Sequence, residues 1–402
     1  MSSLSLLPPE LRDHILDCLA DDKHTLRRCA LTTRSWVPRA QHNLFHSIYI
    51  DWSNCYAFTR ILSSSPHLAS HVATLEIEGA FGIFSMDRLH GATLDAWLRA
   101  IPDSFSHQLS NLTKLELALI TIDAELVRRV FGRLAGISHL TLWACALTSF
   151  DVFVELLASY PRLTRLSIAF TQEWETCAPP TAVVPENAVL PQLKVVELTS
   201  SHDNFKVLKW LITQDLHRSI HTFICLRVPW ASLSSLAHIL AALSPSLQTL
   251  RVGFGDNASA DDLSSVSWSL PVFASLSALT ELTLDIHTNR LAAVPYTLFL
   301  ISRLSVPALR TLAFAIKCGE FDASGHIPWA RLAEASARVA RATPLERVEV
   351  SAKERDEEGD GITPGGFAGR GLPRVDFVEM EMRVMEAFAA QGLEKLVSFT
   401  RT

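Results

Sequence analysis

The chain has 402 residues, of which 48% are hydrophobic and 19% are charged, and its formal net charge at pH 7 is −6. This composition suits a large folded core and argues against a disordered or fibrous chain. The sequence has no Lys/Arg-rich run of the kind that neutralises phosphates, so nucleic acid and membrane surfaces are disfavoured as partners.

Seven cysteines lie at positions 18, 29, 55, 145, 177, 225 and 318, and no two of them form a CxxC pair. Because they are scattered and odd in number, they predict neither a disulfide framework nor a zinc cage. Residues 1–7 lack the basic segment of a signal peptide, and Pro8 and Pro9 end their apolar stretch early. We therefore expect free thiols and a location in the cytosol or the nucleus.

The first predicted helix opens with the sequence Leu7-Pro8-Pro9-Glu10-Leu11 and continues with apolar residues at Ile15, Leu16 and Leu19. Residues 11, 15 and 19 are four apart, which places them on one face of a helix. Proline suits the first helical turn, because its missing N–H would have no partner there. The segment therefore predicts an amphipathic helix that ends before residue 21.

Two further helices are predicted between residues 21 and 50. Asp21 and Asp22 can cap the second helix and place negative charge near its N-terminal dipole. Ser35 can cap the third helix, which carries Trp36. Three short helices bury only a small core, so we expect this module to gain stability from a neighbour or a partner.

The segments LLPPELRDHILDCL, LRRCALTTRSW and AQHNLFHSIYI resemble an F-box, particularly the form found in large fungal collections of such proteins. The resemblance covers residues 4–50 and implies docking to the Skp-type adaptor of a cullin-based ubiquitin ligase. The residues that it assigns to forming or supporting the adaptor-binding surface are Leu7, Pro8, Pro9, Glu10, Leu11, Ile15, Leu16, Leu19, Leu26 and Trp36.

Some of these residues must form the interior of the three-helix module. We expect Trp36 to pack the three helices together, Ile15 and Leu19 to face inward, and Pro8 and Pro9 to be exposed. The alternative is that the three helices are an ordinary cap on the domain that follows.

From residue 72 on, one pattern recurs: an apolar residue, two spacers, an apolar residue, one spacer and an apolar residue. The copies begin at Val72, Leu112, Ile137, Leu163, Leu193, Ile220, Leu247, Leu279, Leu309 and Leu345, and the copy at Ile220 is the weakest. Most copies are 25 to 32 residues apart, which fits or slightly exceeds the period of leucine-rich repeats. In a strand, the last two apolar residues of each copy point to the same face.

Segments between the copies predict helices at 123–134, 150–159, 205–216, 231–243, 294–304 and 329–342. The expected fold is therefore α/β, with an N-terminal three-helix F-box and a leucine-rich-repeat-like solenoid that has a curved parallel sheet and outer helices. The predicted organisation is an F-box over 4–50, a helical linker or cap over 51–71, the solenoid over 72–352, a flexible insertion over 353–375, and a terminal helix with a capping strand over 376–402.

The repeats depart from the usual pattern in their turns. Leucine-rich repeats usually carry an asparagine or cysteine after the strand, where its burial helps to satisfy the loop backbone, and only Cys145 matches here. Residues 176–191 contain four prolines and predict a loop inserted at the rim. The array is therefore degenerate.

No motif points to catalysis, a metal or a cofactor. His67 and His71 share a helical spacing but lack the glutamate of a zinc hydrolase. The acidic run from Asp356 begins like a calcium loop, but Phe367 stands where the bidentate glutamate is needed. We expect a protein that is not an enzyme, although a catalytic pair assembled only by the fold would not be visible in the sequence.

The outward positions of the predicted strands are available to a partner. Trp143 is a plausible anchor, because tryptophans dominate many interface energies, but it could equally lie under the loop at 176–191. The acids and arginines are mixed, so they define no charge class for the target. The candidate substrate-binding residues are Glu78, Glu116, Trp143, Arg165, Arg251 and Asp285.

The leading functional hypothesis is a substrate-recognition subunit of a cullin-type (SCF) ubiquitin ligase, with the adaptor bound by the F-box and an unknown protein target bound by the repeats. A first alternative is a non-catalytic repeat scaffold whose helical head only caps the solenoid. A second is an enzyme without a recognisable motif.

Overall fold

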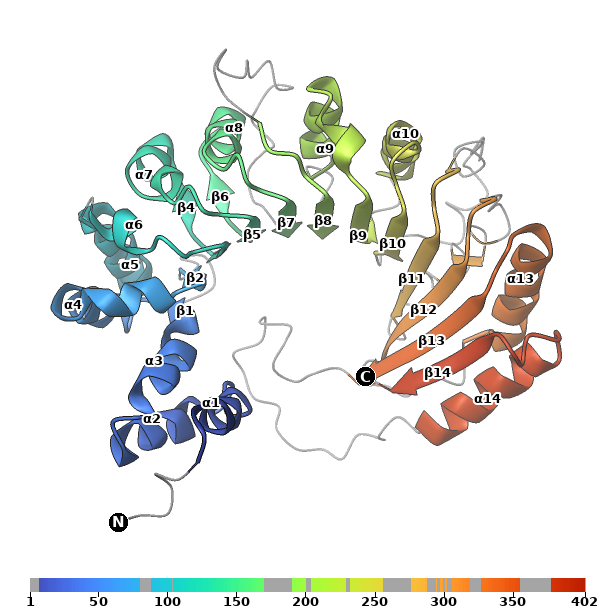
Figure 1. The fold of residues 1–402 in the computed structure, drawn as a ribbon. Coiled ribbons are helices and arrows are strands. Elements are labelled where there is room, and N and C mark those ends of the chain that lie inside the picture. Colours follow the sequence, from blue (N-terminus) through green and yellow to red (C-terminus); the bar gives the residue numbers. More distant parts are fainter. Residues whose placement is uncertain are drawn as a thin grey trace. The chain divides into compact units, whose positions relative to one another are not determined.

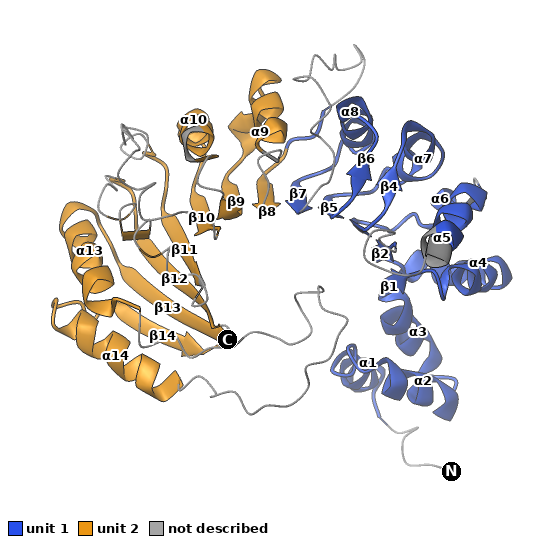
Figure 2. Ribbon diagram, turned by 180° about the vertical axis from the view of Figure 1, so that it is seen from behind, with its two compact units in different colours: residues 1–192 blue, residues 193–402 orange. Residues whose placement is uncertain are grey.

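The computed structural model describes residues 7–79, 88–102, 104–169, 190–199, 204–228, 232–255, 276–287, 294, 297–298, 301, 306–318, 327–354 and 377–401. The chain divides into two compact units, residues 1–192 and 193–402 (Figure 2). The fold is α/β: three N-terminal helices precede a leucine-rich-repeat-like solenoid of parallel strands and helices (Figure 1). The predicted fold class is confirmed.

The first unit opens with α1 (Pro9–Asp17), α2 (Lys23–Thr32) and α3 (Val37–His46), which together form the three-helix module. Asp22 caps α2 as expected, because its carboxylate accepts a hydrogen bond from the Thr25 amide at 2.9 Å. The expected Ser35 cap of α3 is wrong: Trp36 occupies the N-cap position and forms no side-chain cap bond. Helix α3 begins at Val37 with Pro38 in its first turn, where a proline N–H is not needed.

The sheet of the first unit contains β1 (Ser47–Ile50), β2 (Thr74–Glu78), β3 (Lys114–Ala118), β5 (His139–Trp143) and β7 (Arg165–Ala169), in that order and all parallel. The middle apolar residues of the repeats stand in register, as Leu75, Leu115, Leu140 and Leu166. The predicted ladder is therefore confirmed here. Strand β1 is an addition that the sequence analysis did not predict.

The other elements of this unit are α4 (Cys55–Ser64), η2 (Pro66–His71), α5 (Arg88–Ala100), α6 (Ser104–Gln108), β4 (Thr121–Ile122), α7 (Ala124–Arg129), η3 (Phe131–Arg133), β6 (Ala146–Leu147) and α8 (Phe150–Ala158). Helices α4 to α8 lie on one face of the sheet (Figure 1). We call the opposite face of the sheet the open face. It carries the side chains that alternate along each strand with the ladder residues. The helix predicted over 123–134 is interrupted at Val130, between α7 and η3.

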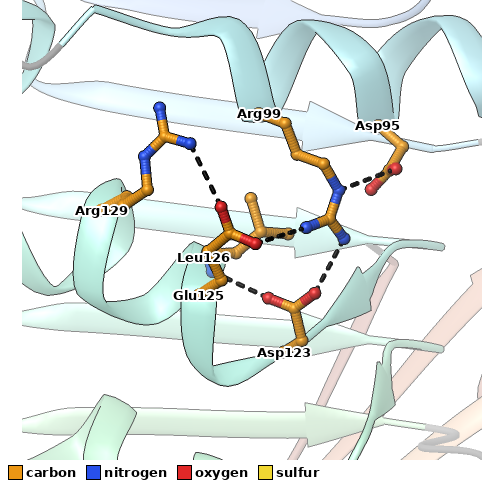
Figure 3. Close-up of polar contacts among 6 residues, drawn as sticks. All are labelled: Asp95, Arg99, Asp123, Glu125, Leu126 and Arg129. Atoms are coloured by element: carbon orange, nitrogen blue, oxygen red, sulfur yellow. Dashed lines mark hydrogen bonds and ion pairs between the residues drawn. The ribbon is translucent and has the colours of Figure 1, made fainter.

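Charged side chains join α5 to the start of α7 (Figure 3). The Arg99 guanidinium bonds Asp95 at 3.0 Å, Asp123 at 2.7 Å and Glu125 at 3.3 Å. Asp123 also caps α7 by accepting a hydrogen bond from the Leu126 amide at 2.8 Å. These contacts fix two outer helices of neighbouring repeats against each other.

The second unit contains β8 (Val195–Thr199), β9 (Thr222–Val228), β10 (Thr249–Phe254), β11 (Glu281–His287), β12 (Thr311–Cys318), β13 (Arg347–Glu354) and β14 (Val397–Arg401), again in order and parallel. Phe223, Leu250, Leu282, Leu312 and Val348 continue in register, so the ladder is confirmed in this unit as well. The last strand, β14, lies in the segment 376–402, where a terminal capping strand was expected.

Helices α9 (Asn204–Thr213), α10 (Leu233–Leu243), α13 (Trp329–Ala342) and α14 (Phe377–Ala389), with η5 (Leu216–Ser219), lie on one face of this sheet (Figures 1 and 2). Its other face is the open face of the second unit. The predicted helix at 294–304, the loop at 176–191 and the insertion at 353–375 lie wholly or largely outside the described residues.

A backbone motif recurs where the strands start. The residue that precedes a strand accepts two hydrogen bonds through its carbonyl. One comes from the N–H of the first residue of the next strand, and the other from the N–H of the residue just before that strand. Ala73 accepts from residues 113 and 114, Thr113 from 138 and 139, and Ser138 from 164 and 165. The second unit repeats this arrangement at residues 194, 221, 248, 280 and 310. These hydrogen bonds satisfy carbonyl and N–H groups of the turn backbone even though the repeats vary in sequence.

No helix in the described part of the chain is long and apolar enough to cross a bilayer. Within the same ranges, no group of three or more His, Cys, Asp and Glu side chains is placed to hold a metal ion.

Candidate protein-binding surfaces

Helix α1 presents apolar side chains to solvent. Leu11 and Ile15 lie one turn apart and are 52% and 39% exposed. Pro8, Pro9 and Glu10 are exposed at the start of the same helix. Exposed aliphatic side chains grouped on one short helix are typical of a surface that a partner covers.

Ile15 was expected to face inward, and this prediction is wrong. Its neighbour Leu16 is fully buried, whereas Ile15 lies on the solvent side of α1 with Leu11. Leu19 is partly buried against the module's core, so it faces inward in part. The hydrophobic spacing of an isolated helix cannot distinguish a face that contacts α3 from a face that awaits a partner.

The interior of the three-helix module consists of Leu16 from α1, Leu26 from α2, Ala40 from α3 and Trp36 at the N-cap of α3. The expected packing role of Trp36 is confirmed. Because Leu16, Leu26 and Trp36 are buried, they can support a binding surface but cannot themselves contact a partner. The residues available for contact are Pro8, Pro9, Glu10, Leu11 and Ile15, with Leu7 half-buried beside them.

An ion pair fixes the direction of α1. Arg39 on α3 binds both carboxylate oxygens of Asp17, at 2.6 and 2.7 Å, and Asn43 donates to the carbonyl of Leu16 at 2.9 Å. The bond from Arg39, followed by one from Asn43, lowers the pKa of Asp17 to about 2. The carboxylate therefore stays charged near neutral pH, and the pair holds the last turn of α1 against α3.

The three-helix module also contacts the first repeat. Lys23 on α2 donates to the carbonyl of Ser47 in β1 at 3.0 Å. The ring of His42 on α3 lies 5.5 Å from the ring of His71 in η2. These contacts place the exposed side of α1 relative to the solenoid within the first unit.

The open face of the first unit carries charges in rows. Lys114, His139 and Arg165 are neighbours in register at the starts of β3, β5 and β7. The next row along the strands contains Glu76 on β2 and Glu116 on β3. Basic groups therefore gather at one end of the strands, and acidic groups lie beside them over β2 and β3.

Trp143 lies on this open face between two small residues. Its register partners are Ala118 on β3 and Ala169 on β7, and its side chain is partly exposed. Partial exposure beside two small side chains suits an interface anchor. The loop at 176–191, the alternative cover for this ring, lies outside the described residues.

Glu78 and Glu116 also lie on the open face, and each has a partner. The Tyr49 hydroxyl donates to Glu78 at 2.6 Å, and Lys114 forms an ion pair with Glu116. Tyr49 was not among the predicted site residues, because the short strand β1 was not predicted either. The alternation in Ser47-Ile48-Tyr49-Ile50 was the only signal for it in the sequence.

In the second unit, Asp285 was expected to be available to a partner, and this prediction is wrong. Its side chain is fully buried and receives two bonds from Arg251 on the neighbouring strand, at 2.9 and 2.8 Å. Gly253 stands opposite Asp285 in register, and a Cβ there would lie 3.0 Å from the Asp285 Cβ. Because Gly253 has no side chain, Asp285 has the space to turn toward Arg251.

One cysteine has the role that its position predicted. The thiol of Cys145 lies within a buried turn and donates to the Leu117 carbonyl of the preceding repeat at 3.1 Å. Burial raises the pKa of Cys145 to about 12, so it acts as a neutral donor to loop backbone.

No protein-family model matches the sequence, and no curated protein matches it. Among solved structures, the chain is similar to one from the crystal structure of the Rad7 and Elc1 complex in yeast. The sequence identity is 11% and the TM-score is 0.35, over 90% of this chain and 89% of that chain.

Proposed function

We propose that this protein is the substrate-recognition subunit of a cullin-type (SCF) ubiquitin ligase. In this proposal α1 to α3 bind a Skp-type adaptor, and the open faces of the strands bind a target protein. The observation that supports it most strongly is the F-box-like sequence, folded as three helices that bury Trp36 and leave Leu11 and Ile15 exposed.

Adaptor binding would bury the apolar side of α1. Leu11 and Ile15 would insert between partner helices, and Pro8 and Pro9 would define where the contact begins. The bonds between Arg39 and Asp17 keep this side pointing outward before any partner arrives. A surface organised in advance loses less entropy on binding.

Target binding would use the open face around Trp143. The protein would perform no chemistry itself and would need no metal or cofactor. Holding a target and a ligase in one complex raises the effective concentration of target lysines near the activated ubiquitin. We also propose that this takes place in the cytosol or the nucleus.

A second candidate function has an observation in its favour. Lys23 and His42 contact the first repeat, as expected if the three-helix module only caps the solenoid. A cap has no need for Leu11 and Ile15 on its outer side, so charged substitutions there would leave a pure cap unaffected. These two residues therefore discriminate between the functions.

The test is affinity capture of the tagged chain from eukaryotic cells, with mass spectrometry to detect the adaptor and the cullin. The wild-type chain should recover both, and the double variant Leu11→Glu/Ile15→Glu should recover neither. Met382→Glu is the control, because Met382 is also an exposed apolar residue on a helix, α14 of the other unit. Recovery of the adaptor by the double variant, or failure of the wild type to recover it, would overturn the proposal.

A further inference from the structure

We propose that the open face over β1, β2 and β3 binds a basic, arginine- or lysine-containing segment of the target protein. This surface, the β1–β3 acidic face, consists of Tyr49, Glu76, Glu78, Glu116 and Lys114. The inference rests on the proposed function, since it names the chemistry of the segment that the solenoid would capture.

The acidic face has more negative than positive charge. Glu76 and Glu116 are direct register partners on neighbouring strands, and Glu78 follows on the same face of β2. Lys114 is paired with Glu116. One lysine among three carboxylates leaves an excess of two negative charges at this position on the sheet.

Glu76 is the least satisfied of the three carboxylates. Glu78 receives the Tyr49 hydroxyl and Glu116 receives Lys114, but no other described residue forms a hydrogen bond or ion pair with Glu76. Its pKa is raised, first by burial and then by the charges of Glu116 and Glu78, and the charge of Lys114 opposes this shift only in part. Like charges directly opposite each other on adjacent strands destabilise a sheet, so this arrangement costs folding stability. A cation placed over Glu76 would offset that cost.

An aromatic ring borders the unsatisfied carboxylate. Tyr49 is the register partner of Glu76 on β1, and its side chain is 42% exposed. Its hydroxyl bond to Glu78 holds the ring across the two strands. Carboxylates beside a fixed aromatic ring suit a guanidinium or an ammonium group, through charge-assisted hydrogen bonds and a cation–π contact.

The nature of the occupant follows from the shape and the charge of this surface. The carboxylates are spread along two strands and, among the described residues, do not converge as metal ligands would. The negative charge repels nucleic acid phosphates. An extended basic peptide segment fits a sheet face that carries separated carboxylates.

The experiment measures fluorescence anisotropy of the full chain with two labelled probe peptides, an Arg-Ser repeat and a Glu-Ser repeat. The wild type should bind the Arg-Ser peptide more tightly, and added salt should weaken this binding. Glu76→Gln should lower the affinity about tenfold, the size expected for one charge-assisted hydrogen bond. The same substitution should raise the thermal midpoint, because it removes like-charge repulsion. Weaker binding together with a higher midpoint could not result from misfolding.

Glu349→Gln is the control, because it removes one carboxylate from β13 in the other unit, where Glu349 is paired with Arg347. Equal loss of affinity in the control, unchanged affinity in Glu76→Gln, or equal binding of the Glu-Ser peptide would each overturn the inference.

Adaptor binding by the same samples separates the two proposals. If Glu76→Gln binds the adaptor and also keeps wild-type peptide affinity, only the present inference is wrong. If the wild type selects the Arg-Ser peptide but does not bind the adaptor, only the ligase role is wrong.

Discussion

The ion pair between Arg251 and Asp285 places a buried carboxylate on the open face of the second unit. The Asp285 side chain has no exposed surface, whereas 35% of the Arg251 side chain is exposed. The carboxylate therefore depends on the ion pair more than the guanidinium does. The carboxylate has lost all contact with water, while the guanidinium keeps part of its hydration.

This asymmetry predicts different costs for the two single substitutions. Arg251→Ala leaves a buried carboxylate without a cation and should lower the free energy of unfolding by on the order of 3 kcal/mol. Asp285→Asn keeps the shape of the side chain and lets the guanidinium turn to water, so its cost should be clearly smaller. Urea unfolding curves measure both changes, and an equal or larger cost for Asp285→Asn would contradict this interpretation.

The sequence predicts much less about single residues than about repeats. Alternation places Asp285 correctly on the open face, but it does not show that Arg251 reaches it or that Gly253 makes room for it. For the same reason the orientation of Ile15 could not be predicted: its exposure depends on where α3 packs. Contacts between elements decide these positions, and helical or strand periodicity does not describe such contacts.

The contact between α3 and η2 contains three histidines. The ring of His42 lies 5.5 Å from each of the rings of His46 and His71. Burial, followed by the charges of Arg39, His71 and His46, lowers the pKa of His42, while Asp17 acts weakly in the opposite direction. Protonation of His42 is therefore harder in the folded protein than in the unfolded chain.

The lowered pKa of His42 predicts that stability depends on pH. The contribution of neutral His42 is fully present above its unfolded pKa of about 6.5 and is lost progressively as the pH falls toward its lower folded pKa. Urea midpoints should therefore fall as the pH is lowered below about 6.5. His42→Gln cannot be protonated and should reduce this fall. An identical pH profile in the variant would contradict the prediction.

At the scale of the elements, the repeat pattern was a reliable guide. Two apolar residues separated by one spacer lie on the same face of a strand but not of a helix, so the ladder and its register were predictable from Leu75 to Val348. Strand β1 was missed because its four residues directly follow α3 without a turn signal. The break after α7 was also missed. A Cβ on Gly132 would lie 2.8 Å from the Val127 carbonyl, so the tight turn there requires a glycine.

At the scale of the whole molecule, β1 links the three-helix module to the solenoid. It pairs with β2 over Ser47–Ile50, and Ile50 is fully buried. These four residues are part of the sheet in the first unit, although they also fall within the segment that resembles an F-box.

Two truncations test this arrangement. A chain that starts at Ser47 keeps the pairing with β2, whereas a chain that starts at Asp51 loses it together with the burial of Ile50. Burial of an isoleucine contributes about 1.5–3 kcal/mol, so the shorter chain should unfold at a distinctly lower temperature. Circular dichroism melting curves measure the difference, and coincident curves would argue against β1 as an integral strand.

The sequence predicted two kinds of organisation in this chain, a small helical module followed by a repeat array, and the structure has both. It did not reveal how charge is distributed, because Tyr49, Glu76 and Glu116 become neighbours only when β1, β2 and β3 align in register. A target chemistry could therefore be proposed only with the fold in hand.

The most direct test of the ligase role is calorimetric titration of the purified full chain with a purified Skp-type adaptor. We predict one-to-one binding by the wild type and by Met382→Glu, and no binding by Leu11→Glu/Ile15→Glu, with unchanged far-ultraviolet circular dichroism in all three proteins. The absence of heat with the wild type, or wild-type affinity in the double variant, would contradict the assignment of α1 as an adaptor-binding surface.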